Sequence, residues 1–159
     1  MSEAKFKTMR HIETVRNFLG AFIIDLIHRQ SQHDQTKLRS PEMEILEEYT
    51  PRLRSLTYAS EEYKKCMKEM EVGVLHHYRN NSHHPEYYPD GIKGMNLLDL
   101  VEMLADWKAA GLRHHDGDLL KSIEINQAKY GFSDELKAIL INTAKWLNAR
   151  SVYHRAQES

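Results

Sequence analysis

The chain has 159 residues, and its 22 Lys and Arg nearly balance its 23 Asp and Glu, which gives a formal net charge of -1. This length suits one domain with its own core, and the even charge balance excludes a global basic field that would attract nucleic acid or a membrane. Small ligands or protein partners are therefore the expected binding partners. The single cysteine excludes an intramolecular disulfide, and the start of the chain lacks a signal-peptide pattern, so we expect a cytoplasmic protein.

Apolar residues recur at spacings of three and four over residues 7–30, which predicts a long amphipathic helix with an inward-facing stripe. His11 lies at the head of this stripe, so we expect it to point toward the core. Asp25 interrupts the longest apolar run, which is too short and too polar to span a bilayer. We expect His33 and Asp34 to lie in a short loop after this helix.

Two serines predict the starts of the next helices. Ser40 followed by Pro41 predicts the N-cap and the first position of a helix that should end before Pro51. Ser60 predicts the cap of the following segment, whose apolar spacing places His77 on its buried face. His77 is therefore a better ligand candidate than the histidine before it.

Two stretches of the chain combine histidines with a loop pattern. Residues 80–95 are rich in Asn, Pro and Gly, so we expect His83, His84 and Glu86 in a loop or a short turn between helices. Loops held by rigid helices are common places for chemistry. Residues 114–116 form a second stretch with two histidines, which we interpret as an ordinary solvated loop.

The last part of the chain predicts three more helices. Asp106 borders the apolar side of the first of them. No segment has the pattern of a strand, so the sequence predicts an all-α fold formed by a single compact domain over residues 1–159. Each of these helices follows a capping residue: about 97–110 after Asn96, about 119–130 after Asp118, and about 134–150 after Ser133.

Histidines and carboxylates recur at inward-facing helix positions and helix junctions along the chain. Imidazole and carboxylate together suit Mn, Fe, Co, Ni or Zn, whereas Mg and Ca sites are normally built from oxygen ligands alone. The pattern therefore predicts a site for one or two divalent transition-metal ions. The candidate ligands are His11, His33, Asp34, His77, His83, His84 and Asp106.

The order of these residues resembles the HD superfamily of metal-dependent phosphohydrolases. The H, HD and D signature of that superfamily matches His11, His33, Asp34 and Asp106. The resemblance implies an HD-domain-like helical fold whose metal-site core covers about residues 10–110. The C-terminal helices at about 118–150 would follow this core.

A closer likeness is to the HD-GYP branch. The segment from His33 to Lys37 resembles its HD-x-x-K element, and the run from His83 to Glu86 resembles its double-histidine element. The GYP tripeptide is missing, and the interval from His77 to His83 is shorter than in that branch. The H-x-x-x-N-x-H-H-P-E pattern from His77 to Glu86 is also similar to one found in a group of small phage and bacterial proteins.

The resemblance implies a reaction and a division of the ligands. The Asp of the doublet typically bridges two ions in this superfamily, which assigns the bridge to Asp34. The implied reaction is hydrolysis of a nucleotide or related phosphoester, a phosphomonoester or phosphodiester, by a water that the metal activates. One ion would be held by His11, His33 and Asp106, and the other by His77, His83 and His84.

Other polar residues near these ligands are candidates for catalysis, substrate binding and support of the ligands. Lys37 is expected to be catalytic by stabilising charge on the phosphate, and Glu86 or a spare histidine is expected to protonate the leaving group. Glu102, one turn before Asp106, is a candidate acceptor for the N–H of a ligating histidine. The candidate substrate-binding residues are Lys37, Arg79, Asn81 and Lys93.

Two other functions stay open at this point, as does the oligomeric state. A diiron oxygenase of the HD superfamily would use much the same ligands. A non-catalytic module that binds a nucleotide or a protein partner would retain the histidines for structural reasons. In such a module, His33 and Asp34 would form a turn and helix cap, and His77 would be a hydrogen-bonded core histidine.

Overall fold

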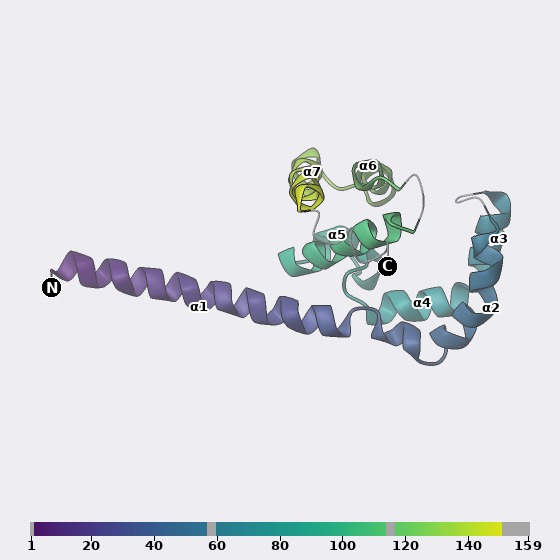
Figure 1. Cartoon of the computed structure of the whole chain (residues 1–159), viewed down its shortest axis with the longest axis horizontal. Coiled ribbons are helices and arrows are strands. Elements are labelled where there is room, and N and C mark those ends of the chain that lie inside the picture. Colours follow the sequence, from purple (N-terminus) through teal and green to yellow (C-terminus); the bar gives the residue numbers. More distant parts are fainter. Residues whose placement is uncertain (1, 57–59, 114–116, 151–159) are drawn as a thin grey trace. The chain divides into compact units, whose positions relative to one another are not determined.

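The computed structural model describes residues 2–56, 60–113 and 117–150, and every regular element in these ranges is a helix (Figure 1). The all-α prediction is therefore confirmed. The chain forms two compact units, Met1–Asn81 and Ser82–Ser159, and the expected single domain stays a prediction. The loop expected at residues 114–116 lies outside the described residues. In the described part of the chain, no helix is both long enough and apolar enough to cross a membrane.

The first unit begins with α1 (Glu3–Gln32), a helix of 30 residues that is about 45 Å long. Ser2 caps it by accepting a hydrogen bond from the Lys5 amide at 3.3 Å. The predicted helix is confirmed and is longer at both ends, but the expected inward face is wrong, because none of these 30 described residues is buried. Apolar periodicity shows that a helix has a face suited to burial, and it does not identify what covers that face.

Four shorter elements complete the first unit, and α2 packs against the other three. The element η1 also contacts α4, so α2 holds together two segments that are far apart in the sequence. This packing is the frame of the candidate site. The four elements are η1 (Gln35–Leu38), α2 (Glu42–Arg54), α3 (Glu61–Glu69) and α4 (Glu71–Asn80).

Both predicted boundaries of α2 differ from the structure. Pro41, and not Ser40, occupies its N-cap position, and no side chain caps this end. The helix also continues through Pro51 instead of ending before it. Proline removes one N–H donor from a helix, and Pro51 lies near the end of α2, so the disturbance is confined to the last turns.

The predicted single segment after Ser60 is two helices. Ser60 caps α3 as predicted and accepts a hydrogen bond from the Tyr63 amide at 3.1 Å. Met70 ends α3 and begins α4, so the chain turns at this residue. The predicted burial of His77 is confirmed, since it is 7% exposed, whereas His76 is only partly buried.

The second unit contains two short turns followed by three helices. The caps predicted for the three helices are confirmed, because Asn96, Asp118 and Ser133 each accept a backbone N–H of the helix that follows. Gly131 separates the last two helices in the left-handed conformation, with φ at 64°. The elements are η2 (Pro85–Tyr87), η3 (Gly91–Gly94), α5 (Leu97–Gly111), α6 (Leu119–Tyr130) and α7 (Asp134–Ala149).

The core of the second unit lies where α6 packs against both α5 and α7. Met103 and Leu104 of α5 are fully buried there, as is Ile123 of α6. Leu140 and Ala144 bring α7 into the same cluster. This apolar packing makes α5 a rigid support for the loop that precedes it.

Asp99 fastens that loop to α5. Its carboxylate is 1% exposed and accepts hydrogen bonds from Ser82 Oγ at 2.9 Å, from Tyr88 Oη at 2.7 Å and from the Asn96 amide at 2.8 Å. These donors lie at the start, the middle and the end of the loop. Asp99 therefore fixes the segment that carries His83 and His84.

Candidate metal centre

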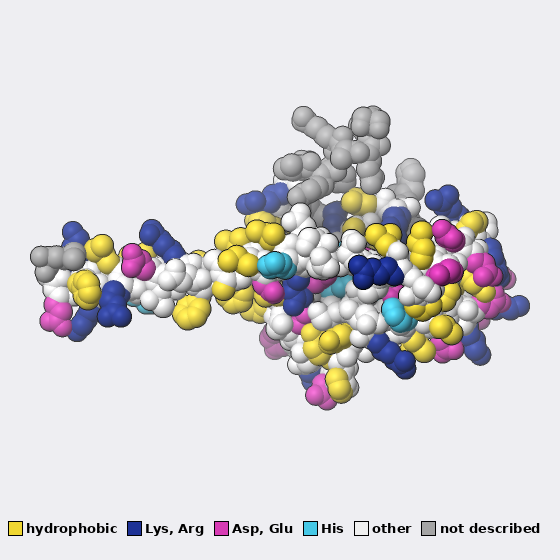
Figure 2. Space-filling view, turned by 90° about the horizontal axis from the view of Figure 1, so that it is seen from below, with side chains coloured by type: hydrophobic (Ala, Val, Ile, Leu, Met, Phe, Trp, Pro, Cys, Tyr) yellow, Lys and Arg dark blue, Asp and Glu magenta, His cyan; other side chains and the backbone are white. Residues whose placement is uncertain are grey.

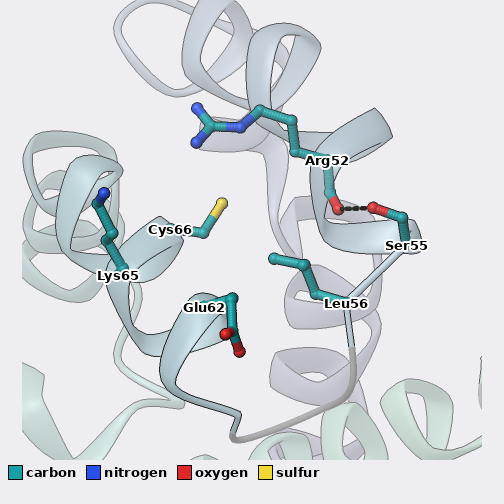
Figure 3. Close-up of a pocket in the computed structure, with 6 residues that line it drawn as sticks. All are labelled: Arg52, Ser55, Leu56, Glu62, Lys65 and Cys66. Atoms are coloured by element: carbon teal, nitrogen blue, oxygen red, sulfur yellow. Dashed lines mark hydrogen bonds between the residues drawn. The ribbon is translucent and has the colours of Figure 1, made fainter.

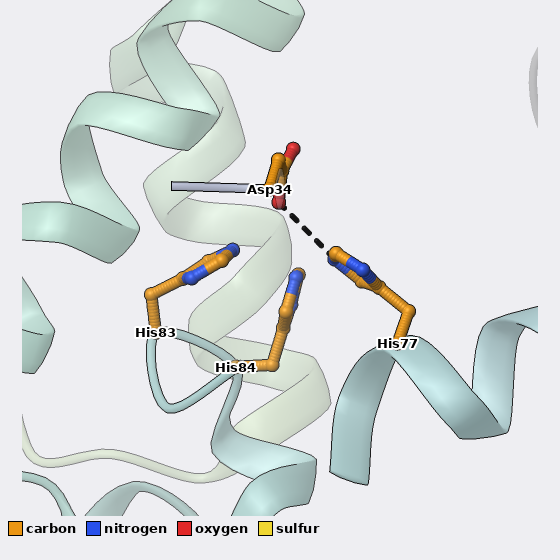
Figure 4. A group of neighbouring side chains, drawn as sticks. All are labelled: Asp34, His77, His83 and His84. Carbon is orange, nitrogen blue, oxygen red and sulfur yellow. Dashed lines mark ion pairs between the residues drawn. The ribbon is translucent and has the colours of Figure 1, made fainter. Parts of the chain in front are cut away.

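In the first unit, Asp34 lies at the junction of α1 and η1 with its backbone in the left-handed region, at φ 58°. A short polar side chain tolerates this conformation better than most residues do. Oδ1 of Asp34 lies 3.4 Å from Nε2 of His77 (Figure 4), and Oδ2 lies 3.5 Å from Nε2 of His33. Lys37 donates a hydrogen bond from Nζ to Oδ2. The two oxygens of one carboxylate therefore face two different imidazoles.

These separations fit a metal ion better than a direct hydrogen bond. A hydrogen bond between N–H and O normally spans about 2.7–3.2 Å. Two ligand atoms that each lie about 2.1 Å from one ion at a tetrahedral angle are about 3.4 Å apart. The group formed by His33, Asp34 and His77, which we call the first ligand set, thus has donor atoms and spacings that suit ion binding.

Glu42 of α2 determines which nitrogen of His77 faces Asp34. Its Oε2 lies 2.8 Å from Nδ1 of His77, and its Oε1 lies 2.7 Å from Nδ1 of His76. A carboxylate accepts hydrogen bonds, so the Nδ1 proton of His77 is directed to Glu42 and the Nε2 lone pair is directed to Asp34. This carboxylate–histidine arrangement commonly supports metal ligands.

Nothing in the sequence singles out Glu42. An acidic residue in the first turn of a helix is usual, because it interacts favourably with the helix dipole. Glu42 occupies such a place in α2, and it is nevertheless only 2% exposed. Its role depends on a contact across 35 residues of sequence, which only the packing of α2 against α4 creates.

Asn81 also supports the first ligand set. Its amide donates hydrogen bonds to Thr36 Oγ1 at 2.9 Å and to the His77 carbonyl at 2.8 Å. Asn81 is 8% exposed, so its side chain joins η1 to the end of α4. Both amide hydrogens are directed to partners inside the unit, and the role expected for Asn81 in substrate binding stays a prediction.

Burial and local charges together hold Asp34 and His77 in the forms that bind metals. Burial alone would raise the pKa of Asp34, but the hydrogen bond and charge of Lys37 outweigh that effect. The charges of His33 and His77 add to it, and the pKa of Asp34 lies below its usual 3.8. Burial, together with the charge of Lys37, lowers the pKa of His77 below its usual 6.5 despite the opposing effects of Asp34 and Glu42. Metals require a carboxylate and a neutral imidazole.

The second unit carries a comparable arrangement. Nδ1 of His83 lies 3.2 Å from Oε1 of Glu102 on α5, and His83 is 1% exposed. The ring of His84 lies next to that of His83, with centroids 4.2 Å apart (Figure 4). The position predicted for Glu102, beside the N–H of a candidate ligand, agrees with this contact. We call His83 and His84 the second ligand set. Asp106 is partly buried and lies one turn beyond Glu102 on α5.

The structure does not bring His11 to the first ligand set. His11 is exposed on α1, and 22 residues of the chain separate it from His33. This corresponds to about 33 Å along the helix. The expectation that both bind one ion is corrected, because a continuous helix cannot place them together.

The remaining predicted residues are Glu86, Arg79 and Lys93. Oε1 of Glu86 accepts hydrogen bonds from Lys129 Nζ and Tyr130 Oη, both at 2.9 Å, so this carboxylate fastens η2 to α6. The expectation that Glu86 is a general acid stays a prediction. Arg79 and Lys93 are exposed, on α4 and η3 respectively.

A hollow of about 330 Å³ lies between α2 and α3 in the first unit (Figure 3). Cys66 is buried at its wall, and Arg52 is paired with Glu69 at 2.9 Å. The sequence did not point to this hollow, and its lining differs from the predicted site. The lining residues are Arg52, Ser55, Leu56, Glu62, Lys65 and Cys66.

The described residues define an all-helical protein with histidine and carboxylate groups positioned to hold a metal ion. Residues 1–146 match a family described as a family of unknown function (DUF5662), so the chain belongs to that family. No curated protein and no solved structure matches the chain.

Proposed function

We propose that the chain is a divalent-metal-dependent hydrolase of phosphoesters. One observation carries the proposal: the carboxylate of Asp34 lies between Nε2 of His33 and Nε2 of His77, at 3.5 and 3.4 Å. A carboxylate with an imidazole at each oxygen is suited to bridging two ions. The resemblance to the HD superfamily supports the same role for Asp34.

The first ligand set would hold the metal. The resemblance to the HD superfamily assigns His83, His84 and Asp106 to the same centre, and this assignment stays a prediction. Mn, Fe, Co, Ni and Zn all accept such nitrogen and oxygen ligands. A bound divalent metal would lower the pKa of a water from about 15.7 toward about 7 and stabilise charge on a phosphoryl group.

The chain's own residues prepare this chemistry. Glu42 orients His77 through Nδ1, at 2.8 Å. Lys37 binds Oδ2 of Asp34 and holds the pKa of that carboxyl low, so Asp34 is ionised as a ligand must be. The Lys37 ammonium also places a positive charge beside the ligand set, where a phosphate oxygen would gain from it.

The proposed substrate class is a nucleotide or related phosphoester. It rests on the usual substrates of the HD superfamily and on the positive charge of Lys37. A nucleoside monophosphate and a cyclic nucleotide both fit this class.

Elemental analysis combined with a hydrolysis screen tests the proposal. Protein purified without chelators is analysed for bound metals, loaded with Mn or Co, and assayed for phosphate release from nucleoside monophosphates and opening of cyclic nucleotides. Asp34→Asn should lose both metal and turnover. Asp25→Asn is the matched control, since Asp25 lies on α1 and pairs with Arg29 at 3.0 Å, and it should keep both.

Two other results would replace the proposal. Bound iron with oxygen consumption and no phosphate release would identify an oxygenase. In the other case, purified protein would contain no stoichiometric metal, and the wild type and Asp34→Asn would bind a nucleotide equally well. That result would identify a non-catalytic module.

A further inference from the structure

The helix α1 carries an exposed apolar stripe. Large apolar side chains recur along its surface (Figure 2). Four of them, between 41% and 55% exposed, follow one another at spacings of three, four and three residues. We call these four the α1 stripe: Ile12, Val15, Leu19 and Phe22.

This spacing is that of the core positions of a coiled coil. Apolar residues that alternate at three and four residues keep one seam of a helix facing a partner helix. Leu26 continues the spacing by one step, and Phe18 and Ile23 widen the seam on either side, at 67% and 58% exposed. An apolar surface of this kind marks an interaction site.

We propose that the α1 stripe binds the α1 stripe of a second copy of this chain. The proposal is independent of the proposed metal chemistry. A second copy is favoured because coiled-coil packing inserts apolar side chains of one helix between those of the other. Two copies of the α1 stripe have the same spacing, so each offers the apolar surface that the other needs.

The area of the stripe fits a weak dimer. A half-exposed Phe contributes about 100 Å², and a half-exposed aliphatic side chain about 50 Å². Two Phe and four aliphatic residues on the stripe and its flanks, extended by Met9 and the partly exposed Leu26, give on the order of 500 Å² per copy. The total of about 1,000 Å² reaches the lower bound for a specific interface.

Charge favours an antiparallel pair. Residues 3–16 contain Lys5, Lys7, Arg10 and Arg16 against two glutamates, whereas residues 17–32 carry only Asp25 and Arg29. A parallel pair would place the two basic halves side by side. An antiparallel pair places each basic half beside a neutral one, and it also aligns the helix dipoles favourably.

The mass of the protein in solution tests the pairing. Sedimentation velocity over a range of concentrations should show the wild type passing from one to two chain masses. Leu19→Glu should abolish the dimer, while Ile24→Glu should retain it. The two sites are similarly exposed, at 55% and 59%, but lie about 140° apart around the helix. Circular dichroism verifies that both variants keep their helices.

A distance between spin labels tests whether the two α1 helices pair in the antiparallel orientation. A spin label attached at Ser2→Cys, with Cys66→Ser removing the native thiol, gives the distance between two labels in the dimer. An antiparallel pair centred near Leu19 predicts about 50 Å, and a parallel pair predicts a much shorter distance. A wild type that stays at one chain mass, or equal behaviour of the Leu19 and Ile24 variants, would overturn the proposed pairing. A short label distance would overturn the antiparallel arrangement.

Discussion

Glu42 Oε2 lies 2.8 Å from Nδ1 of His77, and this contact directs the opposite nitrogen of the ring toward Asp34. His83 has a similar relationship with Glu102, at 3.2 Å. Each compact unit therefore contains a buried histidine whose Nδ1 faces a carboxylate. A histidine held in this way presents Nε2 in one tautomer and one orientation, which is the requirement for a metal ligand.

Glu42→Gln should weaken metal binding by about 10- to 100-fold, because the neutral amide no longer fixes the tautomer of His77. Competition with a chelating dye measures the affinity, and ¹⁵N chemical shifts of the His77 ring report the tautomer. Glu44→Gln is the control, since Glu44 lies on the same helix and is exposed. An unchanged affinity together with an unchanged tautomer would show that Glu42 does not position His77.

Asp34→Ala should remove more metal than His33→Ala or His77→Ala does. Each imidazole faces a different oxygen of Asp34, so removing one histidine affects one ion, whereas removing the carboxylate affects both. Elemental analysis after dialysis against a metal buffer gives the number of ions per chain.

The exposed His28 on α1 supplies the control for these variants, and His28→Ala should bind as much metal as the wild type. If the loss of one histidine empties the site as completely as the loss of Asp34, the first ligand set holds a single ion. Equal metal content in all the variants would instead place the ion elsewhere.

The helices were predictable because their signals are local. Asn96, Asp118 and Ser133 each bond to backbone groups two or three residues away, so the residue type alone reveals the helix start. The turn at Met70 was missed, since an apolar residue in an apolar spacing carries no sign of a helix boundary.

The candidate site was predictable in part. His33 and Asp34 are neighbours in sequence, and the apolar spacing before His77 correctly predicts its burial. The same spacing misplaced His11, because it predicts a face suited to burial without showing whether anything covers it. Glu42 could not be found, since its contacts with α4 arise only from the packing of helices 35 residues apart.

Without metal, the protein should lose stability progressively as the pH falls below about 6.5. The pKa of His77 is lower in the folded state than its usual 6.5, so the unfolded chain takes up this proton first and gains stability relative to the folded chain. The pKa of Asp34 in the folded state lies below its usual 3.8. The stability that ionised Asp34 contributes is therefore present above pH 3.8, and it is lost as the pH falls through the lower pKa of the folded state.

Urea unfolding of chelator-treated protein between pH 8 and pH 3 measures this dependence. His77→Gln should flatten the decline that begins near pH 6.5, while His11→Gln should leave it unchanged because His11 is exposed. A profile for His77→Gln that follows the wild type would show that His77 does not cause the decline.

Asp99→Ala should destabilise the second unit by about 3 kcal/mol, because it removes a buried acceptor and leaves several donors without their partner. Ser82 Oγ, Tyr88 Oη and the Asn96 amide all bond to this carboxylate. The loop that they anchor carries the second ligand set, so the His83 and His84 ring signals in an NMR spectrum should broaden or shift as well. Asp90→Ala, at an exposed position of the same loop, should change the free energy of unfolding by less than about 0.5 kcal/mol. Equal unfolding free energies for the two variants would mean that the loop is held by its other contacts and that Asp99 is not its anchor.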